Sequence, residues 1–106
     1  MSNRQIGEIV SAANPESKSI SGAELLKASA KAQNTFITAQ LTPVAAGNFE
    51  IELEAAVNTQ GSSAFTKIGS WDQDSDTRMS VLPVSMSVSY RFKRVSGVNC
   101  RCVLTG

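Results

Sequence analysis

Side chains in the last quarter of the chain alternate between apolar and polar types, and this alternation is the strongest constraint on the fold. The apolar positions form one series before the Ser96-Gly97 break and a second series after it. The two series are Val84, Met86, Val88, Tyr90 and Phe92, then Val98, Cys100, Cys102 and Leu104. Successive side chains leave opposite faces of a β-strand, so a period of two indicates strands. We therefore predict two terminal strands joined as a hairpin through residues 95–97.

Similar patterns upstream predict further strands. Residues 49–57 alternate apolar side chains with three glutamates, and β-type runs also occupy residues 36–41, 64–71 and 78–82. Short strands separated by turn signals are typical of antiparallel sheets with one dry and one wet face. The predicted fold class is all-β, a small antiparallel β-sandwich or barrel-like domain.

The first 20 residues are polar and have few apolar side chains, and Asn14-Pro15 marks a turn. We predict an irregular N-terminal arm over residues 1–20 and the β-sandwich domain over residues 21–106. Such an arm would be mobile alone and would order on a neighbour. Its deletion (residues 1–19) is then expected to spare the fold and weaken attachment to a partner.

Residues 21–32 allow two local structures. Ser21 and Glu24 form the Ser-x-x-Glu pattern of a helix capping box, and a helix-compatible run follows. The small residues around Ala23 and Leu25 also permit a strand. Helix and strand both remain open for this segment.

Composition limits the classes of function. A chain of 106 residues forms one domain, and its net charge of +1 provides no basic field for binding nucleic acid. No apolar run reaches the ~20 residues of a membrane span, and the N-terminus lacks the pattern of a signal peptide. We expect a protein made in the cytoplasm, without direct contact with a membrane or nucleic acid.

The residues that could support chemistry form no catalytic or metal-binding set. Cys100 and Cys102 share one face of a strand, which predicts buried, reduced thiols, and the chain has no His and no third Cys. Asp72, Asp74 and Asp76 are spaced like the start of a calcium loop, but Thr77 stands where that loop requires glycine. A solvated loop capped by its own aspartates is favoured. We expect no enzyme activity and no cofactor.

Charged residues form two rows in the strand patterns. Glu50, Glu52 and Glu54 make an acidic row, while Arg91, Lys93 and Arg101 make a basic one. If the strands are neighbours, the rows pair within one subunit, which is the favoured alternative. Otherwise the rows are complementary stripes suited to contact between copies.

Trp71 is the sole tryptophan of the chain. Its side chain either packs in the core, which is favoured, or stacks on a sugar or an interface at the end of its strand.

The C-terminal part of the chain resembles small virion structural proteins of tailed bacteriophages. The matching features are Gly47-Asn48-Phe49 opening an alternating strand, the strand that ends at Trp71, Tyr90-Arg91-Phe92, and the closing Ser96-Gly97 turn. The resemblance implies a small β-sandwich in a virion, and some proteins of this kind are capsid decoration proteins. It implies no catalytic residues.

From the residues and the resemblance together, we expect a non-enzymatic capsid decoration or cement protein that binds the capsid surface in many copies. Its partners would be the major capsid protein or another virion protein, and further copies of itself in a homo-oligomer. Its location would be the virion, assembled in the host cytoplasm. The alternative is a tail or baseplate module that binds a carbohydrate or receptor. The candidate partner-binding residues are Ile6, Ile9, Val10, Trp71, Arg91, Lys93 and Arg101.

Overall fold

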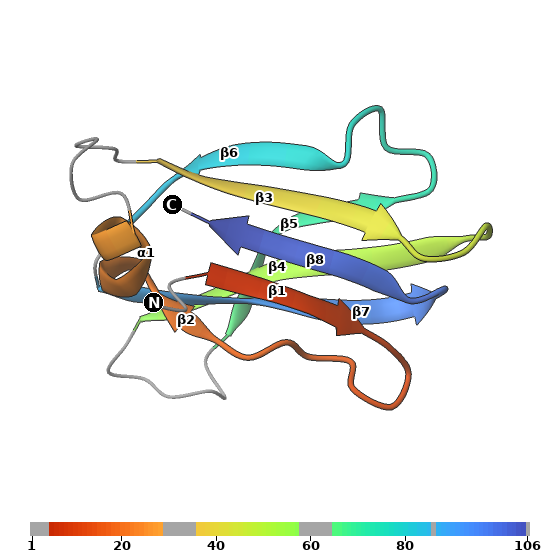
Figure 1. Cartoon of the computed structure of the whole chain (residues 1–106), viewed down its shortest axis with the longest axis horizontal. Helices are drawn as coiled ribbons and strands as arrows, with labels where there is room; N and C mark the ends of the chain where they lie inside the picture. Colours follow the sequence, from red (N-terminus) through yellow and green to blue (C-terminus); the bar gives the residue numbers. More distant parts are fainter. Residues whose placement is uncertain (1–4, 29–35, 58–64, 86, 106) are drawn as a thin grey trace.

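The computed structural model of the chain describes residues 5–28, 36–57, 65–85 and 87–105. Two four-stranded antiparallel sheets pack face to face, with one short helix at an end of the sandwich (Figure 1). The elements are β1 Gln5–Val10, β2 Ile20–Ser21, α1 Gly22–Ala28, β3 Phe36–Pro43, β4 Phe49–Val57, β5 Thr66–Asp72, β6 Met79–Pro83, β7 Val88–Gly97 and β8 Cys100–Thr105. The all-β sandwich is confirmed, and the sheets do not close into a barrel.

The order of the strands explains how the chain wraps. One sheet has the order β1-β8-β3-β6 and the other has the order β2-β7-β4-β5. First and last strands pair, as do second and seventh, third and sixth, and fourth and fifth. A long hairpin folded over on itself gives this arrangement, which is the eight-stranded jelly roll. Strands far apart in the sequence therefore lie side by side in both sheets.

The alternating sequence pattern places apolar side chains between the sheets. Those on the inner faces form one continuous core with less than a tenth of their surface exposed. The core residues are Ile6, Val10, Ile20, Leu25, Ile37, Ala39, Leu41, Phe49, Ile51, Leu53, Trp71, Tyr90, Phe92, Cys100, Cys102 and Leu104. Because both sheets contribute, the core closes only when the whole chain is in place.

Residues 22–28 form helix α1, so helix and not strand is the structure of this part of residues 21–32. The Glu24 backbone N–H donates to Ser21 Oγ over 3.2 Å, as expected for an N-cap residue. Leu25 is fully buried and fixes the helix against the open end of the sandwich. The remaining residues of the predicted segment, 29–32, lie outside the described residues.

The predicted irregular arm is wrong for the residues that the structure describes. Residues 5–10 are strand β1, paired along its length with β8. Ile6 and Val10 are buried in the core. Glu8 occupies an inward-facing position between them, which hides the alternation in the sequence. Its carboxylate accepts the Lys18 backbone N–H at 3.2 Å.

Residues 15–17 of the expected arm are held against the second sheet. Ser17 N–H donates to the Phe92 carbonyl over 3.0 Å, and Phe92 N–H donates to Ser17 Oγ over 2.9 Å. Arg94 N–H donates to the Pro15 carbonyl over 2.6 Å. The segment therefore crosses from one sheet to the other and seals the side of the sandwich between them.

The predicted C-terminal hairpin is also wrong. The first terminal strand begins at Val88 and not at Val84, because residues before it turn and the Ser85 N–H donates to the Tyr90 hydroxyl at 3.1 Å. Strands β7 and β8 belong to different sheets, so the turn after Gly97 crosses between sheets. Met86, in the predicted alternating series, lies outside the described residues.

Candidate protein-binding face

The outer face of the β2-β7-β4-β5 sheet is charged and largely neutralised within the chain. Glu54 and Arg91 stand opposite each other on β4 and β7, and their side chains meet at 2.9 Å. Their side chains are only 8% and 15% exposed. Lys67 Nζ lies 3.9 Å from the Glu52 carboxylate. The favoured alternative, in which acidic and basic rows pair within one subunit, is confirmed between β4 and β7 for Glu54 and Arg91. Glu50, the first member of the acidic row, instead lies opposite Asp72.

Arg91 is the centre of this charged face. Besides Glu54, its guanidinium lies 3.2 Å from the Glu16 carboxylate and 4.1 Å from the ring centre of Phe65. These contacts join the chain before β2 to the sheet and place an aromatic ring over the cation. An arginine so enclosed stabilises the fold and offers a partner little free surface.

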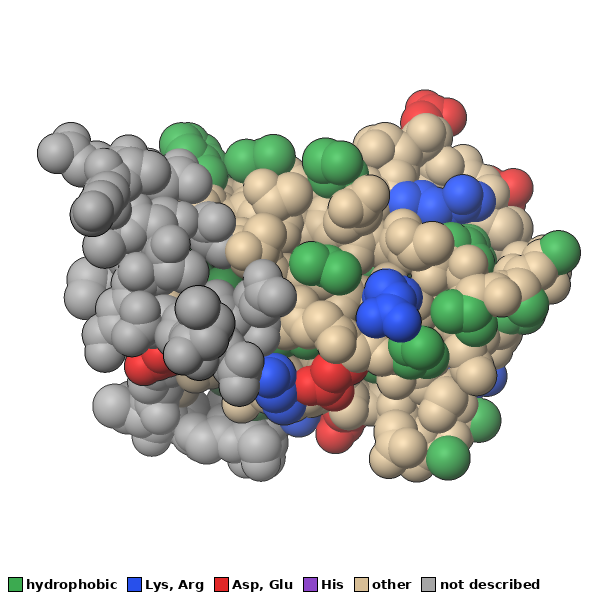
Figure 2. Space-filling view, viewed as in Figure 1, with side chains coloured by type: hydrophobic (Ala, Val, Ile, Leu, Met, Phe, Trp, Pro, Cys, Tyr) green, Lys and Arg blue, Asp and Glu red, His purple; other side chains and the backbone are tan. Residues whose placement is uncertain are grey.

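The outer face of the β1-β8-β3-β6 sheet has a different character. Strands β3 and β6 contain no charged residue. Side chains that point away from the core on β1, β8, β3 and β6 are apolar or neutral except for Arg101. We call this the low-charge face, and its residues include Ile9, Arg101, Val103, Phe36, Thr38, Gln40, Thr42, Met79 and Val81. In Figure 2 it is mostly tan and green over β3 and β8.

Register brings particular side chains of the low-charge face together. Arg101 is directly opposite Ile9 on β1 and Thr42 on β3, and it has no ion-pair partner among the described residues. Val103 lies opposite Gln40. The face therefore presents one exposed cation surrounded by short, stiff or apolar groups, a composition suited to contact with a protein that supplies a carboxylate.

The structure distributes the predicted partner-binding residues over three places. Ile9 and Arg101 are neighbours on the low-charge face. Three of the others, Ile6, Val10 and Trp71, are in the core. The remaining two are on the charged face, where Lys93 stands opposite Glu52 in the register of β4 and β7.

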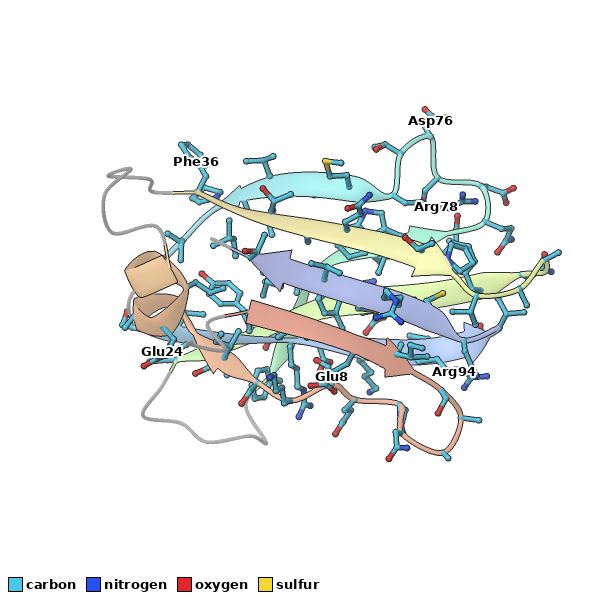
Figure 3. All side chains as sticks on the ribbon, viewed as in Figure 1. Glu8, Glu24, Phe36, Asp76, Arg78 and Arg94 are labelled. Carbon is cyan, nitrogen blue, oxygen red and sulfur yellow. The ribbon has the colours of Figure 1, made fainter. Side chains whose placement is uncertain are left out.

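Sequence reasoning identified Ile9 but missed other exposed apolar members of the low-charge face. Phe36, Met79 and Val81 are 47%, 45% and 61% exposed, high values for large apolar side chains. The alternation of β3 does indicate this exposure. Ile37 and every second residue after it face the core, so Phe36 lies on the outer face. Figure 3 shows Phe36 pointing away from the sandwich at the start of β3.

Trp71 has the favoured core position. Its side chain is 5% exposed, and its ring centre lies 6.3 Å from that of Phe92. A tryptophan packed between the sheets offers no face on which a sugar could stack.

Both cysteines are free and buried, as predicted. Burial raises the pKa of the Cys102 thiol to about 12, and burial also raises the pKa of Cys100. Thiols held in the protonated form are poor nucleophiles and poor metal ligands.

The aspartate loop closes on itself. The Asp74 N–H donates to Asp72 Oδ1 over 2.9 Å, and the Asp72 N–H donates to Ser75 Oγ over 3.0 Å. This is the self-capped loop that the sequence favoured. Within the described ranges, no three His, Cys, Asp or Glu side chains are grouped to hold a metal ion. Over the same part of the chain, no helix has the length and hydropathy needed to cross a membrane.

Comparisons of this chain with protein families, with curated proteins and with solved structures gave no match.

Proposed function

We propose that this chain is a non-enzymatic structural protein of a bacteriophage virion, a capsid decoration protein that binds the capsid surface in many copies. The observation that supports this most is the contrast between the two outer faces. One face pairs Glu54 with Arg91 within the chain, while the other presents an almost uncharged surface around Arg101. A protein that pairs charges within the chain on one outer face and leaves the other face for contact is suited to attachment to a larger surface.

Two further observations support the proposal. The sequence resembles small phage virion proteins, and the jelly-roll order of the strands recurs in viral capsid and lectin domains. The likeness in fold is an analogy, because one fold serves many functions. The low-charge face adds the specific element, namely a surface on which repeated weak contacts could hold many copies.

In this mechanism the low-charge face lies on the capsid. Ile9 and Val103 lose water on contact, and Arg101 pairs with a carboxylate of the major capsid protein. The charged face points outward and keeps the particle soluble. No bond is made or broken.

The test is co-sedimentation of the purified chain with capsids assembled from the major capsid protein of the same virus. Arg101→Glu should greatly weaken binding, because it places a carboxylate opposite the proposed acidic partner. Lys93→Glu makes the same charge change on the opposite sheet and should leave binding unchanged. Circular dichroism and thermal melting verify that both variants fold.

Equal loss of binding in both variants, or none in either, would contradict the use of the low-charge face. An intact chain that ignores capsids and binds a host glycan would favour the alternative, a tail or baseplate module. Because Trp71 is buried, such a module would have to use other side chains.

A further inference from the structure

Strand β6 is an open sheet edge, and the devices that protect it are its short length and its terminal Pro83. It is the last strand of its sheet and pairs only with β3 among the described residues. Proteins also protect exposed edges with charged side chains, bulges or covering segments. The sequence of β6, Met-Ser-Val-Leu-Pro, contains no charge, and its register with β3 is regular.

The other edge strands of the two sheets have such protection. Strand β1 has Glu8 at its middle, and the Glu8 carboxylate holds the backbone of Lys18 beside that edge. Strand β5 has Lys67, and its register with β4 shifts next to Ile68, which is left out of the pairing. Strand β2 has only two residues, and residues 15–17 continue the cover of β7. Among the described edge strands, β6 is therefore the one without a charge, a bulge or a covering segment.

The hydrogen-bond pattern shows which backbone groups β6 leaves open. The Leu41 N–H donates to the Arg78 carbonyl over 2.8 Å, which fixes the phase of the ladder between β3 and β6. In an antiparallel pair, bonded and non-bonded positions alternate. Ser80 and Leu82 therefore direct their backbone groups to β3, while Val81 directs its N–H and carbonyl to the open edge.

Met79 and Pro83 share the orientation of Val81. The Met79 N–H lies 3.3 Å from the Thr77 hydroxyl, and proline has no N–H to leave unpaired. Along the edge, Val81 is consequently the residue with both a donor and an acceptor open. Its side chain is also 61% exposed, the highest value for a large apolar residue in the described ranges.

We propose that β6 pairs antiparallel with β6 of a second copy of this chain, about a twofold axis at Val81. In that register Val81 faces its counterpart and exchanges two N–H to carbonyl bonds with it. Met79 faces Pro83, so the Met79 N–H can turn from Thr77 to the Pro83 carbonyl. Because Pro83 has no N–H, the two bonds that it would donate to the Met79 carbonyls, between the central Val81 pair and the outer Met79 bonds, are not formed.

The side chains of β6 also favour pairing with β6 of a second copy. On the low-charge face, Val81 would pack on Val81 and Met79 on Pro83 of the other copy, covering exposed apolar surface. Since β6 has no charge, pairing with itself brings no like charges together. The contact is isologous, as in most homodimers, and joins the two four-stranded sheets into one. It does not depend on capsid attachment, because the edge and the centre of the face are different surfaces.

The test is sedimentation velocity over a range of concentrations, with Val81→Lys and the matched control Ile68→Lys. Ile68 is also an exposed apolar strand residue, at 48%, but lies on β5 of the other sheet. The wild-type chain and the control should sediment as dimers at concentrations where Val81→Lys sediments as the 11.2 kDa monomer. Opposed lysines at the twofold axis would repel each other.

A second variant keeps the test decisive if Val81→Lys folds poorly. Val81→Cys should be joined to its counterpart by a short bis-maleimide reagent, because the native cysteines are buried. Ile68→Cys should give no such product. A wild-type chain that stays monomeric, a dimer that persists in Val81→Lys, or equal cross-linking of both cysteine variants would overturn the proposal. Loss of capsid binding in Arg101→Glu with dimers intact concerns the proposed function alone.

Discussion

Replacing Ile6 by alanine tests whether the N-terminal segment belongs to the body of the protein. Ile6 is fully buried on β1, opposite Leu104 of β8. Removing the three carbons beyond its Cβ leaves a cavity between the sheets, and such core substitutions cost about 2–5 kcal/mol. A domain of this size has roughly 5–15 kcal/mol of total stability, so the loss is a large fraction.

Ile9 provides the matched control, because it is the same residue type on the same strand. Its side chain is 44% exposed on the low-charge face. Ile9→Ala removes no core contact and should change the free energy of unfolding by no more than about 0.5 kcal/mol. If residues 1–20 were an arm outside the domain, both substitutions would have equally small effects.

Urea unfolding followed by tryptophan fluorescence is the appropriate assay. Trp71 is buried in the other sheet, so its signal reports unfolding of the whole sandwich and not fraying of β1. Ile6→Ala should lower the urea midpoint and, in a thermal scan, the melting temperature by on the order of 10 °C. A shift for Ile6→Ala no larger than that for Ile9→Ala would refute the placement of β1 in the core.

Three more outcomes follow from particular contacts. Arg91→Ala leaves the Glu54 carboxylate, whose side chain is 8% exposed, without its cation and should reduce the free energy of unfolding in urea by about 3 kcal/mol. Gly97→Ala should lower the melting temperature markedly, because Gly97 has φ 89° and an added Cβ would clash with the Asn48 carbonyl oxygen. Burial raises the pKa of the Cys102 thiol to about 12, so the folded state holds this proton more tightly than the unfolded state. The resulting contribution to the free energy of unfolding is complete below about pH 8.5 and should be lost as the pH rises toward 12.

Each of these outcomes has a control. Lys93→Ala, on the same strand as Arg91, should have little effect, and a similar loss in both would remove the special role of the Glu54 pair. Gly69→Ala meets no atom within 4 Å and should be tolerated. Cys102→Ala should flatten the decline of stability at alkaline pH relative to the wild-type chain. An unchanged slope would assign that decline to other groups.

Alternation predicted the strands where side chains alternate without interruption. Phe49–Val57 was predicted with the bounds that β4 has. The same rule missed β1, because Ile9 is apolar on the outer face while Glu8 is polar on the inner one. At a sheet edge an inward carboxylate can turn to a neighbouring backbone N–H, which a periodicity rule does not include.

The candidate site was harder to predict than the strands, because it depends on which strands share a sheet. Placing Arg101 in one basic row with Arg91 requires that consecutive strands are neighbours in one sheet. In this jelly roll the chain crosses between sheets after Gly97, so Arg91 and Arg101 lie on opposite outer faces. Consecutive strands are often, but not always, adjacent, and no local property of the sequence distinguishes a hairpin from a crossing between sheets.

The pairing of strands also explains why the two outer faces differ. Two of the three glutamates of β4 form ion pairs on their own sheet, Glu54 with Arg91 of β7 and Glu52 with Lys67 of β5. The other sheet combines β3 and β6, which have no charge, with β8, whose only charge is Arg101. A face without its own counter-ions gains from a partner that covers its apolar groups and supplies one carboxylate. The proposed capsid contact uses the centre of that face, and the proposed dimer uses its β6 edge, so one copy could make both contacts at once.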